Sequence, residues 1–248
     1  MLLFTVHSRK LPTPHTLPPQ KTFSANPKIE PRKLVERENA ILPAMSQTLP
    51  KNVNFEEFVP WLPENSGVRY ELHNENIIEM EQPAGEHEEI KGFLTVKLSG
   101  IIDRLGLPYL IPNQAIVRPA GKNSGYFPDV LLLNRTKLAQ EKLWKKESII
   151  SEGASIPLII EVVSTNWRDD YYLKFADYEE MGIPEYWIID YAVLGGRNFL
   201  GTPKQPTISV CCLVEEEYQI RQFRDSDRLI SQTFTELNLT VNQIFLSL

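Results

Sequence analysis

The sequence predicts a mixed α/β fold in which a central sheet lies between helices. Residues 158–190 have the pattern of an apolar strand, a helix and a second strand, and residues 86–104 have apolar side chains close to helical spacing. Residues 126–133 are almost continuously apolar, as in a central strand. This order of helix, strands, crossover helix and strand is typical of a sheet covered by helices.

One domain with an extension fits the length of 248 residues and the hydrophobic content of 42%. Residues 1–44 are rich in Pro, Ser, Thr and Lys without periodicity, which predicts a disordered extension. Because Met45 stands just before the first domain-like sequence, our hypothesis is that translation begins there. The domain is then expected over residues 45–248.

Within the domain, Pro, Gly and turn-forming residues mark where the expected helices and strands begin and end. A short helix limited by Pro60 should follow Asn54, and Gly106 should end the helix over 86–104. The other expected elements are a hairpin (69–72 and 76–80), strands (109–117 and 126–133), a charged segment with some helix (134–155), a helix (167–181), a closing hairpin (207–214 and 218–223) and a terminal helix (239–248).

Several function classes have no support in the composition. No apolar run approaches the roughly 20 residues that span a bilayer, and the first residues do not form a secretory signal, so no membrane partner is expected. The adjacent Cys211 and Cys212 suit neither a disulfide nor a zinc site, and indicate thiols packed in a reducing, cytoplasmic compartment. No P-loop or nucleophile elbow is present, so we expect neither a nucleotide cofactor nor a small-molecule hydrolase.

The net charge of -6 argues against a tight nucleic-acid binder. The first 50 residues carry seven Lys and Arg against three Glu, so the remainder is more acidic still. A local basic rim could offset this average. Its candidate residues are Lys122, Arg135, Lys137, Lys142, Lys145 and Lys146.

Two carboxylates stand on strands that are otherwise apolar. Glu161 lies within residues 158–163, and Asp129 follows Pro128 in the other central strand. A buried carboxylate must be paired or bound to a cation. Oxygen ligands of this kind suit Mg²⁺ or Mn²⁺, which can activate a water for attack on a phosphodiester.

The helix over 167–181 carries Asp170, Lys174 and Tyr178 at spacings of four residues, so these side chains share one stripe. They could face the same cleft as Glu161, where the Lys174 amine would position the water or stabilise the transition state. The alternative is a surface Asp–Lys pair that contributes a few tenths of a kcal/mol.

A family resemblance rests on these motifs. They are PD at 128–129, EV at 161–162, Asp170, Lys174, Tyr178, GIPEYWIID at 182–190, YELHNENIIEM at 70–80, and His87 before a long helix. This array resembles the Uma2 family (DUF820), which is abundant in cyanobacteria and belongs to the PD-(D/E)xK restriction-endonuclease-like superfamily. The resemblance covers residues from about 55 to 214.

The resemblance implies a mixed four-stranded core sheet and a DNA endonuclease with Asp129 and Glu161 as ligands of Mg²⁺ or Mn²⁺. In the superfamily motif the lysine stands two residues after the glutamate, where this chain has Val163. The Uma2 pattern carries it on the following helix, where Lys174 matches. Double-strand cutting by such a single-site enzyme would favour a homodimer. The alternative function is a catalytically weak or inactive nuclease-fold module that binds DNA or a protein.

Four further residues are candidates for the site. Glu71 matches the family's first hairpin, where an acid can complete the metal site, but it also fits a solvated strand carboxylate. His87 could contact phosphate or act as a base, or simply cap its helix. Gln114 is expected to line the cleft from the strand before Asp129, and Tyr178 to bring its hydroxyl near the lysine.

Overall fold

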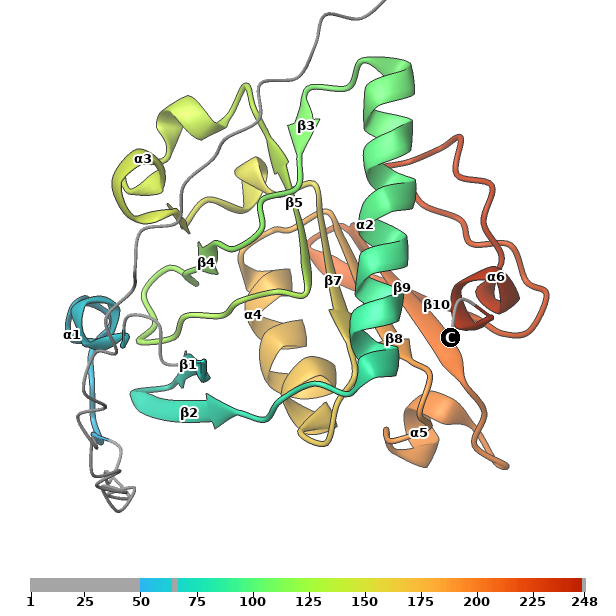
Figure 1. Cartoon of the computed structure of the whole chain (residues 1–248), viewed down its shortest axis with the longest axis horizontal. Coiled ribbons are helices and arrows are strands. Elements are labelled where there is room, and N and C mark those ends of the chain that lie inside the picture. The colour runs from blue at the N-terminus through green and yellow to red at the C-terminus, as the bar shows by residue number, and fades with distance from the viewer. Residues whose placement is uncertain (1–49, 64–66, 247–248) are drawn as a thin grey trace, which may run out of the picture. The chain divides into compact units, whose positions relative to one another are not determined.

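The structure is a computed structural model that describes residues 50–63 and 67–246. The described chain forms one six-stranded mixed sheet, two small sheets of two strands each, and helices on both faces of the large sheet (Figure 1). This agrees with the predicted fold class. The expected extension over 1–44 and the start at Met45 lie outside the described residues.

The large sheet has the strand order β10-β9-β8-β7-β5-β3. Its strands β7 and β8 are parallel to each other, and every other neighbouring pair is antiparallel. The expected four-stranded core is therefore part of a wider sheet. The strands are β3 (Tyr109–Leu110), β5 (Val130–Asn134), β7 (Leu158–Val162), β8 (Glu185–Asp190), β9 (Thr207–Val214) and β10 (Glu217–Phe223).

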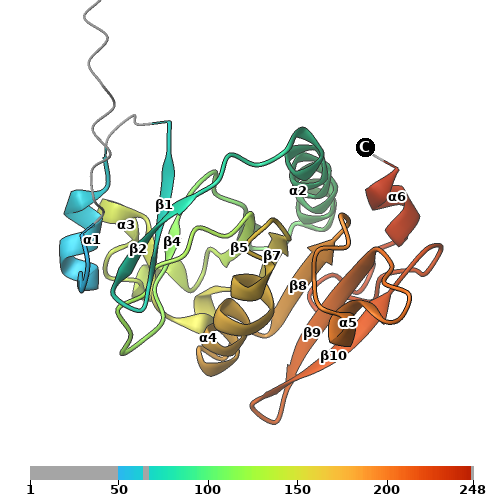
Figure 2. The ribbon, with the colours of Figure 1, turned by 90° about the horizontal axis from the view of Figure 1, so that it is seen from below.

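Helices cover the two faces of the sheet (Figure 2). One face carries α2 (Gly85–Leu105) and α6 (Val241–Phe245), where Ile160 of β7 lies in a core cluster with the α2 leucines. The other face carries α4 (Lys174–Glu180), where Ile159 of β7 lies in a cluster with the aromatic rings of that layer. The alternation along β7 thus sends successive side chains into two different cores.

The amino-terminal elements agree with the prediction. Asn54 caps α1 (Phe55–Trp61) by accepting a hydrogen bond from the amide of Glu57. The hairpin of β1 (Arg69–His73) and β2 (Asn76–Met80) forms a separate small sheet. It is joined to the rest of the domain by hydrogen bonds between the backbones of Leu72 and Gly125.

The prediction of one continuous strand over 109–117 is wrong. It breaks into β3, which pairs with β5, and β4 (Ile116–Val117), which pairs with β6 (Ile149–Ile150) in a different sheet. Pro112 lies in the break and has no amide hydrogen to give to a ladder. The apolar pattern alone predicts one strand here, but the proline within it separates two.

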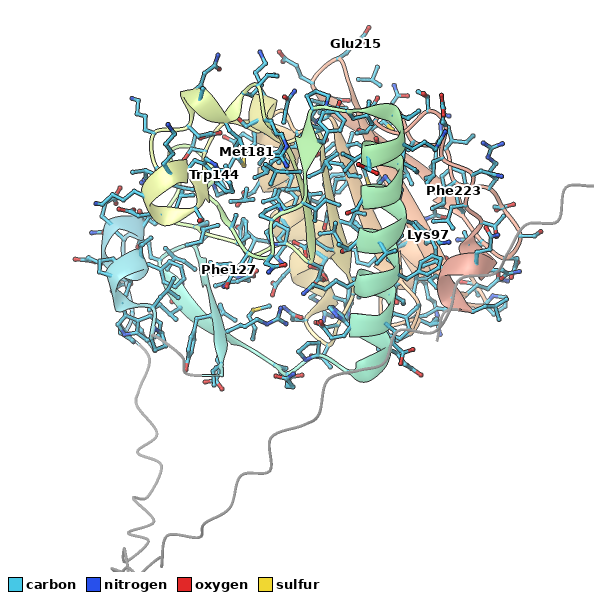
Figure 3. All side chains as sticks on the ribbon, turned by 45° about the horizontal axis from the view of Figure 1, so that its top comes forward. Lys97, Phe127, Trp144, Met181, Glu215 and Phe223 are labelled. Carbon is cyan, nitrogen blue, oxygen red and sulfur yellow. The ribbon has the colours of Figure 1, made fainter. Side chains whose placement is uncertain are left out.

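The remaining segments differ in detail from the prediction. The charged segment over 134–155 holds three short helical pieces, and α5 (Arg197–Leu200) was not predicted. The closing hairpin turns at Glu215 and Glu216, both at positive φ, and Figure 3 shows Glu215 at its tip. The three pieces are η1 (Leu138–Gln140), α3 (Trp144–Glu147) and η2 (Gly153–Ser155).

The predicted helix over 167–181 is present, with one departure from regular geometry. Its first part, η3 (Asp169–Leu173), is a π-helix, and α4 continues from Lys174. Gly182 ends the helix at φ 71°, as its position before Pro184 predicts. No helix in the described part of the chain has the length and apolar composition to cross a bilayer.

Candidate functional site

Asp129 and Glu161 meet at one edge of the large sheet. Val130 pairs with Ile160 in the β5–β7 ladder, so the next residues along each strand, Asp129 and Glu161, are neighbours. The amide of Asp129 donates to Glu161 Oε2 at 3.2 Å, and the amide of Val162 donates to Asp129 Oδ2 at 2.9 Å. The structure therefore brings together the two carboxylates predicted from the apolar strands.

Lys174 is buried beside this carboxylate pair, with 3% of its surface exposed. Its Nζ lies 3.2 Å from Glu161 Oε1 and 3.5 Å from both Glu71 Oε2 and Asp170 Oδ1. Asp170 is buried as well. The alternative of a surface Asp–Lys pair is therefore wrong, since the ammonium group is enclosed by three carboxylates.

The helix that carries the lysine starts with the wide turn η3. Asp170 in this turn, Lys174 and Tyr178 all face the sheet edge, as their spacing predicts. The hydroxyl of Tyr178 donates to Glu161 Oε1 at 3.0 Å, so it contacts the glutamate that the lysine also contacts. Turns of π geometry are rare and are found often at functional sites.

Glu71 is a buried residue of β1 whose two carboxylate oxygens already have partners. Oε1 accepts a hydrogen bond from the amide of Phe127 at 2.8 Å, and Oε2 lies 2.8 Å from His73 Nε2. The solvated alternative is wrong, because Glu71 is 1% exposed. In this arrangement Glu71 faces Lys174, which makes it a partner of the lysine rather than a third ligand beside Asp129.

His73 is a site residue that sequence reasoning missed. It stands two positions after Glu71, so both side chains lie on the same face of β1. Its Nδ1 lies 3.7 Å from Asp169 Oδ2 at the start of η3, and its ring packs edge-on against Tyr126. The two-residue spacing was a signal for the contact between His73 and Glu71. Asp169, the partner on η3, is distant in sequence.

The structure places His87 in the site and Gln114 outside it. His87 is buried in the first turn of α2, with Nε2 3.2 Å from Asp129 Oδ2, and its Nδ1 has no hydrogen-bond partner among residues 50–63 and 67–246. It is therefore part of the site rather than a surface cap. Gln114 is exposed just before β4 and does not line the cavity, because the break at Pro112 takes this segment out of the large sheet.

The electrostatics of the site are dominated by buried carboxylates. Burial, together with the charges of Asp129 and Glu71, raises the pKa of Glu161 to about 7 against the opposing charge of Lys174. Burial also raises the pKa of Asp170 well above its ordinary value. Burial alone would lower the pKa of Lys174, but Glu161 and Glu71 outweigh it, so the amine remains protonated. Three buried acids thus contact the one buried ammonium group.

A cavity of about 220 Å³ opens onto these side chains. The loop after β7 and the loop after β2 meet across it, where Thr165 Oγ1 donates to Glu81 Oε2 at 2.8 Å. The residues that line the cavity include Arg69, Glu71, Glu81, His87, Asp129, Glu161, Asp170, Lys174, Leu194 and the segment from Ser164 to Asn166.

The donor set fits a hard divalent cation. In the described ranges, no group of three or more His, Cys, Asp and Glu side chains is arranged to hold a metal ion on its own. Mg²⁺, however, is commonly held by one or two carboxylates and several waters. The pair of Asp129 and Glu161 beside a cavity meets that need, and the surplus of buried negative charge would be reduced by a cation.

The basic rim expected from the sequence does not border this cavity. Lys122 Nζ is bound to Asp177 Oδ1 and Glu180 Oε2, each at 2.5 Å. Arg135 follows the end of β5 opposite to Asp129. Residues close in sequence to a site can lie at the far end of its strands, which is why the expectation failed.

Comparisons with known proteins agree with the architecture. The family model of Uma2, described as "Putative restriction endonuclease", matches residues 55–242. A crystal structure described as a putative nuclease belonging to DUF820, from Anabaena variabilis, has a TM-score of 0.61 and 16% sequence identity, and covers 79% of this chain and 98% of that chain. It shows the same fold. No curated protein matches the sequence. Since the family model spans most of the chain, the protein belongs to the Uma2 family of restriction-endonuclease-like proteins.

Proposed function

We propose that this protein is a DNA endonuclease that hydrolyses phosphodiester bonds with Mg²⁺ or Mn²⁺. The observation that carries the proposal is the position of Lys174 Nζ, 3.2 Å from Glu161 Oε1, where Glu161 in turn accepts a hydrogen bond from the amide of Asp129. A carboxylate pair and a buried ammonium group at one cavity are the groups that phosphodiester hydrolysis needs. The family match supports a nuclease more generally.

Asp129 and Glu161 would hold the ion. When bound, it supplies positive charge at the phosphate and lowers the pKa of a coordinated water. Lys174 contributes a second positive charge that can orient the attacking water or stabilise charge on the phosphoryl oxygens. The two partners Glu71 and Tyr178 fix the positions of Lys174 and Glu161, respectively.

His87 would position Asp129 rather than react. Its Nε2 lies 3.2 Å from Asp129 Oδ2, and the same oxygen accepts the amide hydrogen of Val162. Burial lowers the pKa of His87, but the hydrogen bond and charge of Asp129 raise it by more. The two contacts hold this carboxylate in one orientation, and its other oxygen lies 4.0 Å from Lys91 Nζ.

Plasmid cleavage tests the proposal. We expect purified protein to cut supercoiled plasmid with Mg²⁺ or Mn²⁺, and the Asp129→Asn, Glu161→Gln and Lys174→Gln variants to lose cutting. Glu185→Gln is a matched control, because Glu185 is a buried acid of the neighbouring strand bound to Trp187 and Ser231. Equal cutting by the wild type and Glu161→Gln would overturn the assignment of this site.

Calorimetry with Mn²⁺ separates catalysis from the alternative function. We expect binding by the wild type and its loss in Glu161→Gln, because the metal requires the ionised carboxylate. A folded wild-type protein that binds no Mn²⁺ and cuts no DNA would favour a nuclease fold used only for binding DNA or a protein. Sedimentation of the active form tests the homodimer expected for double-strand cutting.

A further inference from the structure

A second, larger cavity lies on the other side of the helix formed by η3 and α4. Its volume is about 760 Å³. It lies between this helix, α5 and the strands β8, β9 and β10. The first cavity is lined by Asp170 and Lys174, whereas the second is lined by Tyr171, Tyr172 and Phe175 of the same helix.

Aromatic rings form the walls of this second cavity. Tyr171 and Phe199 are stacked with ring centroids 4.2 Å apart, and Tyr172 meets Phe199 edge-on at 5.3 Å. Tyr172 is 54% exposed, so much of its ring is open to a ligand. Asn198 and Gln222 add amide groups at the cavity wall. Planar aromatic walls with amide groups are suited to a nucleobase, which offers a π-face and hydrogen-bonding edges.

One segment connects the two cavities. Leu194 lines the first cavity and Phe199 the second. Asp190 at the end of β8 fixes this segment, because its carboxylate accepts hydrogen bonds from the amides of Leu194 at 2.9 Å and Gly195 at 2.7 Å. The same carboxylate accepts the hydroxyl of Tyr171 at 3.4 Å. The segment that borders both cavities is therefore held to the end of β8 by hydrogen bonds.

Basic side chains lie near the segment that borders both cavities. Arg168 is exposed and its guanidinium lies 4.4 Å from the ring centroid of Trp167, which comes directly after the cavity residue Asn166. Lys204 Nζ lies 3.3 Å from the carbonyl oxygen of Val193. The stretch 191–214 contains Arg197 and Lys204 but no Asp or Glu. In a chain with net charge -6, this is a local surface suited to a phosphate backbone.

We propose that this aromatic cavity binds an unpaired nucleobase of the DNA strand whose phosphate occupies the Asp129–Glu161 site. The strand would pass Trp167 and Arg168 on its way around the start of η3. This inference rests on the proposed nuclease function and adds the substrate class: DNA with single-stranded character next to the bond that is cut. Paired bases in a duplex cannot enter such a cavity without unstacking.

Binding measured without divalent metal tests the proposal apart from catalysis. Fluorescence anisotropy with a labelled single-stranded oligonucleotide and with its duplex should show tighter binding of the single strand. Tyr172→Ala should weaken single-strand binding by about 5- to 100-fold, since stacking on one ring has that effect, and Tyr172→Trp should restore it. Tyr172 is exposed, so its replacement leaves the core intact.

The control separates Tyr172 from other aromatic residues. Trp144→Ala should bind the single strand as well as the wild type does, because Trp144 is a half-buried aromatic residue of α3 outside both cavities. Single-strand binding that depends on Tyr172, in a protein that cuts no plasmid, would support this surface while rejecting the nuclease.

Three results would overturn the proposal. One is equal affinity for single-stranded and duplex DNA. Another is unchanged single-strand binding in Tyr172→Ala. The third is self-association that Tyr172→Ala abolishes without any effect on oligonucleotide binding, which would make the cavity an interface between copies of the protein.

Discussion

Lys174 Nζ lies 3.2 Å from Glu161 Oε1, although the two residues belong to a helix and to a strand. Val163 stands two residues after Glu161, so the strand itself offers no amine to this carboxylate. The helix supplies the amine from a different backbone position, and both groups are buried.

Replacing Lys174 by Met should separate metal binding from cleavage. Removal of one positive charge leaves Glu161 and Asp129 more attractive to a cation, so we expect Mn²⁺ affinity in calorimetry to be equal or higher. Plasmid cleavage should be lost. The variant should also lose about 3–5 kcal/mol of unfolding free energy at neutral pH in urea titrations, because buried carboxylates lose their partner.

Lys91→Met is the control for this variant. Lys91 Nζ lies 4.0 Å from Asp129 Oδ1 and 3.7 Å from the exposed Glu88, and its side chain is 26% exposed. We expect its loss to change stability by less than about 1 kcal/mol. A Lys174→Met protein that unfolds no more easily than Lys91→Met would contradict the buried position of the ammonium group.

The stability of the metal-free protein should fall as the pH rises from about 5 to 7. The pKa of Glu161 is raised by burial from its ordinary value of 4.5 to about 7, so over this interval the folded protein holds a proton that the unfolded chain releases. The contribution of this group is present below its ordinary pKa and is lost towards pH 7, by about 1–3 kcal/mol.

Urea titrations at pH 5 and pH 7.5 measure this effect. The pKa of Asp129 is lowered because His87 outweighs burial, and the pKa of Glu71 is lowered because Lys174 and His73 outweigh burial, so their contributions change in a more acidic interval. Glu161→Gln should reduce the difference between the two pH values. Added Mn²⁺ should stabilise the wild type more at pH 7.5, since it binds the ionised form. An unaltered pH dependence in Glu161→Gln would contradict the raised pKa.

The parts of the site that the sequence predicts are those that depend on local periodicity. Glu161 stands out because its strand neighbours are apolar, and Lys174 follows from its spacing to Asp170 and Tyr178. These patterns need no knowledge of the pairing between strands. Asp129 stands out for the same reason as Glu161, because it interrupts an apolar run after Pro128.

The parts that the sequence does not predict depend on contacts between distant segments. The place of His73 depends on two partners, Glu71 in its own strand and Asp169 in a distant helix. Asp190 ends β8, and its role in fixing Gly195 is visible only once the loop after β8 is placed. The π-turn at η3 likewise has no signature in the apolar pattern.

Tyr126→Phe should destabilise the protein by about 1–3 kcal/mol. The Tyr126 hydroxyl is buried and donates to Asp177 Oδ2 at 2.5 Å, while Lys122 Nζ binds the other oxygen at the same distance. Loss of the hydroxyl leaves one oxygen of a buried carboxylate without this donor. Thermal and urea unfolding of the variant measure the effect.

Tyr172→Phe is the matched control, because it removes a hydroxyl from an exposed ring. We expect it to change stability by less than about 0.5 kcal/mol. The Tyr126 ring packs edge-on against Tyr178, whose hydroxyl binds Glu161, so Tyr126→Phe should keep this ring contact and retain plasmid cleavage. Similar stabilities of the two variants would show that the hydrogen bond from the Tyr126 hydroxyl to Asp177 contributes little to the unfolding free energy.

Gly195→Ala should disturb the link between the two cavities. A Cβ at this position would lie 2.8 Å from Asp190 Oδ2 and 2.9 Å from Tyr171 Cε2, closer than packed atoms can approach. Because Asp190 is fully buried and held by two backbone amides, we expect a loss of about 1–3 kcal/mol in unfolding free energy.

Gly92→Ala on α2 is the control. Its Cβ would meet nothing within 4 Å, and alanine favours a helix by up to about 1 kcal/mol, so this variant should be as stable as the wild type or more stable. If Gly195→Ala were equally stable, the turn after β8 would be free to move, and the fixed path from Leu194 to Phe199 would lose its structural basis.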